Sequence, residues 1–206
     1  MRLKAALFDL DGVLIDSERL YTVFWDEIER IYPTGIPDFS VTIKGTTLPE
    51  ILSLYPTEEI RADITRRLHE FQDNMDFPLL PGAIEFLDFL HGAGIPVALV
   101  TSSDSRKMER LFAKVPQLKD RFDVIVDASR VTRSKPDPQG YLIAAADCGA
   151  DPADCIVFED SFNGLKAGRA SGARVIALAT THPAEKLAPF ADMVVNSLAE
   201  LTEADL

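Results

Sequence analysis

The sequence has few cysteines and few basic residues, and both shortages exclude classes of protein. Cys148 and Cys155 are too few for a disulfide framework and are typical of buried thiols in a reducing compartment. The 21 lysines and arginines are outnumbered by 33 aspartates and glutamates, which gives a net charge of -12. Because binding to a phosphate backbone requires clustered basic residues, this balance argues against a nucleic-acid partner.

The sequence also lacks a long apolar run. No apolar segment approaches the roughly 20 residues that a membrane-spanning helix needs. The apolar run near the N-terminus is interrupted early by Asp9 and Asp11, so it does not fit the core of a signal peptide. We therefore expect a cytoplasmic protein with no membrane partner. These patterns do not indicate an oligomeric state.

Short apolar runs alternate with helical patterns along most of the chain. Runs typical of strands cover residues 3–8, 96–100, 122–126, 155–158, 174–178 and 193–195. Apolar residues at helical spacing occur between them, in residues 82–92, 104–114, 138–148 and 162–171. Strands that alternate with helices predict an α/β fold, with a parallel sheet covered on both faces.

Residues 17–78 interrupt this alternation. They contain helical patterns in residues 20–31, 50–54 and 58–74 but no convincing strand. Thr47 and Glu50 fit a capping box at the start of the second of these helices. Pro78 and Pro81 mark the return to the alternating pattern. The segment is therefore predicted to be a helical insertion after the first strand.

The first apolar run ends in the sequence DLDG, residues 9–12, which places two carboxylates close together. Alternate residues of an extended chain point the same way, so Asp9 and Asp11 would project to one side. Two such charges repel each other unless a cation lies between them. By itself, Asp11-Gly12 fits a surface turn equally well, so the other strand ends must decide.

Hydroxyl residues and a lysine follow later apolar runs. Thr101, Ser102 and Ser103 offer hydroxyls and backbone N–H groups at a helix start, where an anion can bind. N-capping by Ser103 is the simpler interpretation of this motif alone. Lys135 precedes another expected helix start, where a cation is unfavourable unless it meets an anion. An exposed loop lysine is the commoner case without further support.

The run 155–158 ends in two more acids, Glu159 and Asp160. Ligands of an open parallel sheet bind outside the carboxyl ends of its strands. Acids at two strand ends, hydroxyls at another and one lysine suit a magnesium ion together with a phosphoryl group, because Mg²⁺ takes carboxylate and phosphate oxygens. The sequence therefore predicts that Mg²⁺ is the cation between Asp9 and Asp11.

These motifs, taken in order, resemble those of the haloacid dehalogenase (HAD) superfamily of phosphotransferases. They are DLDGV at residues 9–13, Thr101, Lys135 and EDS at residues 159–161. The whole chain is similar to the subgroup with a small helical cap, which includes β-phosphoglucomutase and sugar-phosphate phosphatases. The resemblance implies a Rossmann-like core, a doubly wound parallel sheet formed by residues 1–16 and 79–206, and a cap formed by residues 17–78.

The resemblance also implies a role for each motif residue. Asp9 would be the nucleophile that forms an aspartyl-phosphate. Asp11 would protonate the leaving oxygen and later activate water. Thr101, Ser102 and Lys135 would bind the phosphoryl group. The Mg²⁺ ligands would be Asp9, the Asp11 backbone carbonyl, Glu159 and Asp160.

The cap is expected to contact the substrate through Lys44 and Gly45, which resemble the substrate loop of β-phosphoglucomutase. A solvated lysine in a glycine turn is the alternative for Lys44. In the core, Ser103 matches a residue of that mutase's distal phosphate site, so it too is expected to contact substrate.

Three other positions depart from the mutase. It has an arginine, a lysine and a histidine where Leu48, Asp104 and Tyr21 stand here. We therefore expect a Mg²⁺-dependent phosphatase of a small phosphorylated metabolite such as a sugar phosphate. A β-phosphoglucomutase-type phosphosugar mutase is the alternative, for which Arg106 or Lys107 could supply compensating charge.

Overall fold

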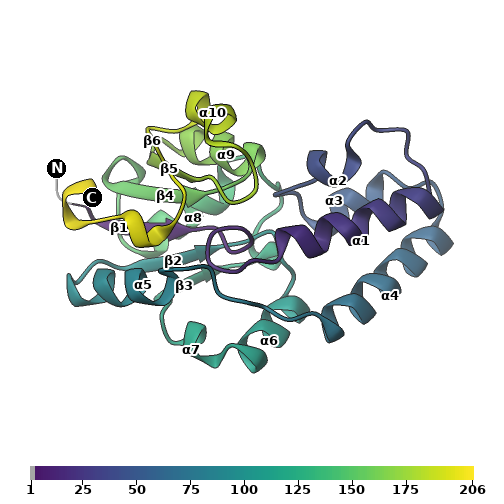
Figure 1. Ribbon diagram of the computed structural model, residues 1–206, viewed down its shortest axis with the longest axis horizontal. Coiled ribbons are helices and arrows are strands. Elements are labelled where there is room, and N and C mark those ends of the chain that lie inside the picture. The colour runs from purple at the N-terminus through teal and green to yellow at the C-terminus, as the bar shows by residue number, and fades with distance from the viewer. Residues whose placement is uncertain (1–2) are drawn as a thin grey trace.

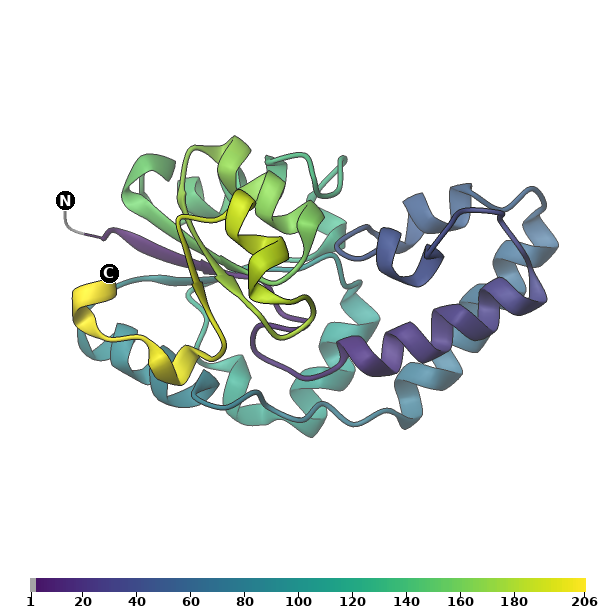
Figure 2. The same ribbon diagram turned by 45° about the horizontal axis from the view of Figure 1, so that its top comes forward.

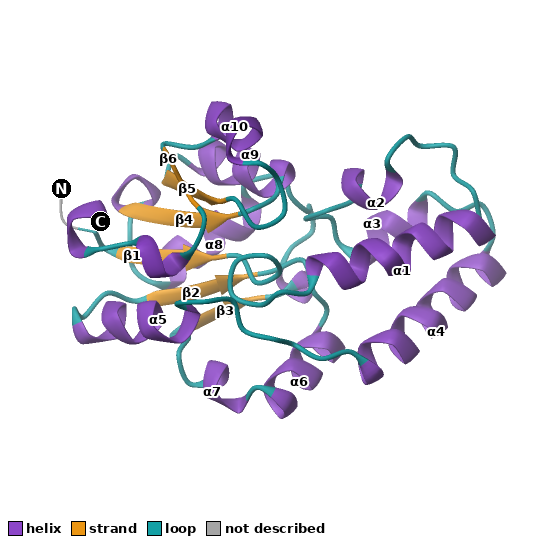
Figure 3. Cartoon of the chain, viewed as in Figure 1, coloured by secondary structure: helices purple, strands orange, loops and turns teal. Residues whose placement is uncertain are grey.

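A six-stranded parallel sheet lies at the centre of the computed structural model, which describes residues 3–206 (Figures 1 and 3). The strands lie in the order β3-β2-β1-β4-β5-β6, and every pair is parallel. They are β1 (Ala5–Phe8), β2 (Val97–Val100), β3 (Val124–Val126), β4 (Cys155–Glu159), β5 (Arg174–Leu178) and β6 (Met193–Val195). This order confirms the predicted doubly wound, Rossmann-like α/β fold.

Helices cover both faces of the sheet. One face packs against α5 (Ala83–Gly92), α6 (Ser105–Lys114) and α7 (Pro116–Lys119). The other packs against α8 (Gln139–Asp147), α9 (Phe162–Ser171) and α10 (Ala184–Leu187). Within β1, Ala6 and Phe8 belong to the first hydrophobic cluster and Ala5 and Leu7 to the second. This alternation explains why the strand is apolar at every position.

Four helices form the segment between β1 and α5. They are α1 (Glu18–Ile31), α2 (Phe39–Thr42), α3 (Leu48–Ser53) and α4 (Glu58–Asn74). They share a hydrophobic cluster of their own, around residues such as Trp25, Tyr55 and Ile64. Figure 2 shows this segment beyond one end of the sheet rather than on either face. The separate cluster supports our proposal that residues 17–78 are a cap on a core of residues 1–16 and 79–206.

The two segments that join the cap to the core lie side by side. The Asp16 N–H donates to the Pro78 carbonyl at 2.8 Å, and the Leu80 N–H donates to the Leu14 carbonyl at 2.9 Å. These contacts tie the start and the end of the cap to the loop that follows β1. The cap is therefore attached directly beside the DLDG motif. No helix in residues 3–206 is both long and apolar enough to cross a membrane.

Candidate active site

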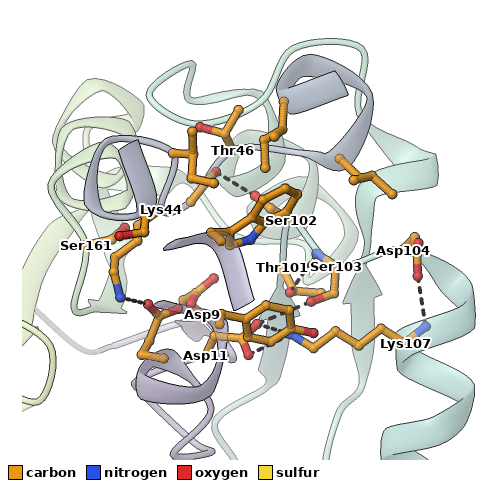
Figure 4. A pocket seen from close by; sticks show the side chains of 18 of the residues that line it. Asp9, Asp11, Lys44, Thr46, Thr101, Ser102, Ser103, Asp104, Lys107 and Ser161 are labelled. Carbon is orange, nitrogen blue, oxygen red and sulfur yellow. Dashed lines mark hydrogen bonds and ion pairs between the residues drawn. The ribbon is translucent and has the colours of Figure 1, made fainter. Parts of the chain in front are cut away.

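The carboxyl ends of three neighbouring strands meet below the cap. Because β1 lies between β2 and β4, the residues that follow these strands, Asp9, Thr101 and Asp160, are neighbours at one edge of the sheet. β1 and β4 are also where the strand order reverses, which is the usual ligand position in such sheets. A pocket there is lined by these core residues, by Ser102 and by the inner face of the cap (Figure 4).

Lys135, from the loop before α8, is the centre of a buried ion-pair network. Its Nζ lies 2.5 Å from Asp9 Oδ1 and 2.7 Å from Glu159 Oε1, and it donates to the Val100 carbonyl at 3.2 Å. Burial would lower the pKa of Lys135, but the carboxylates of Asp9 and Glu159 outweigh burial and raise this pKa well above its usual value. The lysine is therefore charged, and the alternative of an exposed loop lysine is wrong.

Glu159 anchors this network and is fully buried. Its Oε1 accepts hydrogen bonds from Lys135 and, at 3.0 Å, from the Tyr141 hydroxyl. Its Oε2 accepts from the next two backbone N–H groups, at 2.9 and 3.0 Å. A Cβ on Gly164 would lie 1.7 Å from Oε1, so α9 can pass this close only with glycine there. This geometry suits an anchoring residue, while metal ligation by Glu159 stays a prediction.

Three carboxylates could hold a metal ion. Asp9, Glu159 and Asp160 offer oxygen atoms that lie within 4.8 Å of one another. Burial raises the pKa of Asp9 to about 8 although Lys135 lowers it, and burial also raises the pKa of Asp160 well above its usual value. A cation among these groups would offset the cost of burying the carboxylates and would reduce their mutual repulsion. An all-oxygen donor set suits a hard divalent cation.

Gly12 and Thr181 determine where Asp160 points. Gly12 has φ of +78°, and a Cβ on it would lie 2.0 Å from Asp160 Oδ2, so only glycine fits. The Thr181 hydroxyl donates to the same oxygen, and the Thr180 hydroxyl donates to the Gly12 carbonyl at 2.5 Å. The loop after β5 thus supports both acidic motifs. The sequence did not indicate this role, because threonines in a loop form no recognisable motif.

Asp11 is held by three side chains. The hydroxyls of Ser17 and Ser103 donate to its carboxylate, the latter at 3.3 Å. Lys107 Nζ lies 2.6 and 2.5 Å from its two oxygens (Figure 4). The same Nζ lies 4.4 Å from the centre of the Tyr21 ring. Burial would lower the pKa of Lys107, but Asp11 and Tyr21 raise it above its usual value. Lys107 is therefore a charged, buried residue of the pocket.

Asp104, rather than Ser103, caps α6. The Asp104 carboxylate accepts a hydrogen bond from the Lys107 N–H at 2.8 Å, so the alternative of N-capping by Ser103 is wrong. Of the two residues that could supply compensating charge, Lys107 enters the pocket. Arg106 instead pairs with Asp73 at the edge of the cap, at 2.7 Å. Lys107 is the third residue of α6, and the sequence could not show whether its side chain faces the pocket.

The cap loop lies directly on the core motifs. Ser102 Oγ donates to the Gly45 carbonyl at 2.7 Å, and Asn163 Nδ2 donates to the Lys44 carbonyl at 2.9 Å. Lys44 and Gly45 both line the pocket, as do Ser102 and Ser103. The Lys44 ammonium pairs with Glu18 of α1. The alternative of a solvated lysine is therefore wrong, whereas substrate contact by Lys44 stays a prediction.

A contact between cap and core replaces the predicted capping box. Glu50 of α3 accepts hydrogen bonds from the Ser134 N–H, at 2.9 Å, and from the Ser134 hydroxyl. Thr47 precedes α3 but makes no side-chain cap. The capping box is wrong because the Glu50 carboxylate is engaged by Ser134, the neighbour of Lys135 in the chain. One turn of the cap thus contacts the loop that carries the central lysine.

The chain belongs to the haloacid dehalogenase-like hydrolase family, whose family model matches residues 3–172. Hexitol phosphatase A from Escherichia coli is 36% identical over 207 residues, which cover 98% of this chain and 94% of that protein. A phosphorylated carbohydrates phosphatase from Thermotoga maritima is 33% identical over 181 residues, or 82% of each chain. The crystal structure of a β-phosphoglucomutase from Clostridium difficile shares the fold, with a TM-score of 0.81 at 22% identity over 98% of this chain and 94% of that one.

These similarities confirm the predicted family and enzyme class, a HAD-type phosphoric monoester hydrolase. The site agrees with this class, because it combines an acidic cluster that could hold a metal ion with one buried lysine and hydroxyl groups. Such a combination can stabilise the charge of a phosphoryl group during its transfer.

We predict that Glu50→Ala releases the Lys135 loop. A hydrogen bond to a charged group contributes about 1.5–3 kcal/mol, so exchange of the Ser134 amide hydrogen should accelerate roughly tenfold or more. Hydrogen exchange of the ligand-free protein, followed by mass spectrometry or NMR, measures this change. Glu59→Ala, which removes an exposed acid of α4, is the matched control. Equal protection of Ser134 in Glu50→Ala and in the wild type would show that Glu50 does not hold this loop.

Proposed function

We propose that this protein is a Mg²⁺-dependent phosphatase of a small phosphorylated carbohydrate, acting through an aspartyl-phosphate on Asp9. The main support for this proposal is the position of the Asp9 carboxylate. It shares the buried Lys135 ammonium with Glu159, and one of its oxygens lies within 4.8 Å of an Asp160 carboxylate oxygen. The names of the hexitol phosphatase and of the phosphorylated carbohydrates phosphatase support the substrate class. The free thiols of Cys148 and Cys155 support a cytoplasmic location.

Metal binding is assigned to Asp9, the Asp11 backbone carbonyl and Asp160, with Glu159 beside them. When bound, Mg²⁺ neutralises charge on the phosphoryl oxygens and on the carboxylates. The all-oxygen donor set and the glycine at position 12, which leaves room for the Asp160 carboxylate, support this assignment.

The proposed reaction has two steps on Asp9. In the first, the Asp9 carboxylate forms a bond to phosphorus while the bond from phosphorus to the carbohydrate oxygen breaks, and Asp11 gives that oxygen a proton. In the second, Asp11 takes a proton from water, which displaces Asp9 and releases phosphate. Lys135, Thr101 and Ser102 stabilise the charge on the phosphoryl oxygens.

The cap excludes bulk water and selects the substrate in this proposal. Its contacts with Ser102, Ser134 and Asn163 support this role, since each of these residues adjoins a core motif. We also assign substrate contacts to Lys44, Gly45 and Ser103, which line the pocket.

Hydrolysis, rather than isomerisation, fits the charges in the pocket. A mutase must hold a second phosphate under the cap by cationic groups. Both lysines that line the pocket already face a carboxylate, Lys44 with Glu18 and Lys107 with Asp11. Leu48 lines the pocket with an apolar side chain. The lysines that line the described pocket are thus already paired without a second phosphate.

Phosphate release should require Mg²⁺. We expect activity on a panel of phosphorylated carbohydrates to vanish in excess chelator and to return with added Mg²⁺. Asp160→Ala should raise the Mg²⁺ concentration for half-maximal rate by roughly tenfold or more, because it removes a carboxylate ligand. Asp26→Ala, on the exposed side of α1, is the control and should leave that concentration unchanged. Full activity in excess chelator would contradict the proposal.

β-Glucose 1-phosphate distinguishes a hydrolase from a mutase. Each charge-assisted contact to a distal phosphate contributes about 1.5–3 kcal/mol, so lacking two of them weakens binding of a bisphosphate by more than about a hundredfold. We predict phosphate release without efficient formation of glucose 6-phosphate, even with added glucose 1,6-bisphosphate. A coupled glucose 6-phosphate assay, run beside phosphate detection, measures both. Isomerisation much faster than phosphate release would instead establish the mutase.

A further inference from the structure

The cap side of the pocket has an apolar part, in which Gln72 lies. Its walls include Trp25, Ile43, Leu48, Ile51 and Leu68, and Gln72 lies among them on α4. The buried residues of α4 are Ile64, Leu68 and Gln72, which are four apart and therefore share one face of the helix. A glutamine thus occupies a position where the pattern of the helix calls for an apolar residue.

One polar atom of the Gln72 amide lacks a protein partner. Gln72 is 3% exposed, and its Nε2 donates to the Tyr21 hydroxyl at 3.2 Å. Its Oε1 is buried and has no hydrogen-bond partner in residues 3–206. Turning the amide over would exchange the two atoms and leave an N–H group unpaired instead. An unpaired buried polar group destabilises a folded protein. A ligand that forms a hydrogen bond with the unpaired atom would therefore be bound favourably at this position.

Gln72 is also connected to the catalytic side of the pocket. Its partner Tyr21 packs its ring against the Lys107 ammonium, which pairs with Asp11. The amide is therefore held in place by a neighbour that is itself fixed, so its unpaired atom has a defined position. A fixed amide with one unpaired polar atom, set among apolar side chains, is suited to bind an uncharged hydroxyl group of a ligand, because a hydroxyl can both donate and accept a hydrogen bond.

We propose that Gln72 is a specificity-determining residue that accepts a hydrogen bond from a substrate hydroxyl group remote from the phosphate. The ligand class is an uncharged polyol or sugar that carries a single phosphate. This inference rests on the proposed phosphatase function and extends it to the part of the substrate under the cap. A second phosphate is not favoured there, because both lysines of the pocket are paired with carboxylates.

Two esters of equal carbon chain length test the proposal, namely glucitol 6-phosphate and hexyl phosphate, which has no hydroxyl groups. Gln72→Met keeps the approximate size of the side chain but removes both polar atoms. We expect it to lower kcat/KM for glucitol 6-phosphate roughly ten- to a hundredfold and to leave kcat/KM for hexyl phosphate within about threefold, since only the first ester can pair with the amide. Gln117→Met, the same substitution at an exposed position, should change neither value.

Thermal unfolding separates this role from a structural one. Without substrate, Gln72→Met should unfold at the same or a higher temperature than the wild type, because it removes an unpaired buried atom. Equal losses of kcat/KM on both esters, or no loss on glucitol 6-phosphate, would overturn the inference. A lowered unfolding temperature with equal losses would make Gln72 a packing residue. If the wild type released phosphate from neither ester nor from any phosphorylated carbohydrate, the proposed function would fail and this inference with it.

Discussion

The ammonium of Lys135 holds the ends of three neighbouring strands together. It contacts Asp9 after β1, the last carbonyl of β2 at Val100 and Glu159 at the end of β4. Two carboxylates buried this closely would repel each other without a cation. The lysine comes from the loop before α8, so its position also depends on how that loop is held. The geometry of the whole site therefore depends on one charged group.

The contacts around this lysine restrict which residues can occupy the neighbouring positions. Glu159 is anchored by Tyr141 and by backbone N–H groups, and glycine at position 164 lets α9 approach it. The cap reaches the same region through Glu50, which binds Ser134 beside the lysine. The position of the cap and the alignment of the lysine are thus connected through Glu50 and Ser134. In the proposed function, this connection would let a substrate under the cap influence chemistry at Asp9.

Much of the core of the site could be predicted from the sequence, because most of its residues end an apolar strand or directly follow one. Once the strands are parallel, Asp9, Thr101 and Asp160 must meet at one edge of the sheet. Lys107 and Gln72 could not be assigned in the same way. They lie within helices, and their reach into the pocket depends on how α6 and α4 pack. The one-turn helices α2, α7 and α10 were also missed, since four residues show no repeating pattern.

The most direct test of this account is whether Asp9 becomes phosphorylated during turnover. The enzyme would be mixed with Mg²⁺ and a carbohydrate phosphate that it hydrolyses, quenched rapidly in acid and digested for mass spectrometry. We predict a phosphoryl group on the peptide that contains Asp9 in the wild type, and none in Asp9→Asn, which should also release no phosphate. Phosphate release by Asp9→Asn at a rate near that of the wild type would contradict the account.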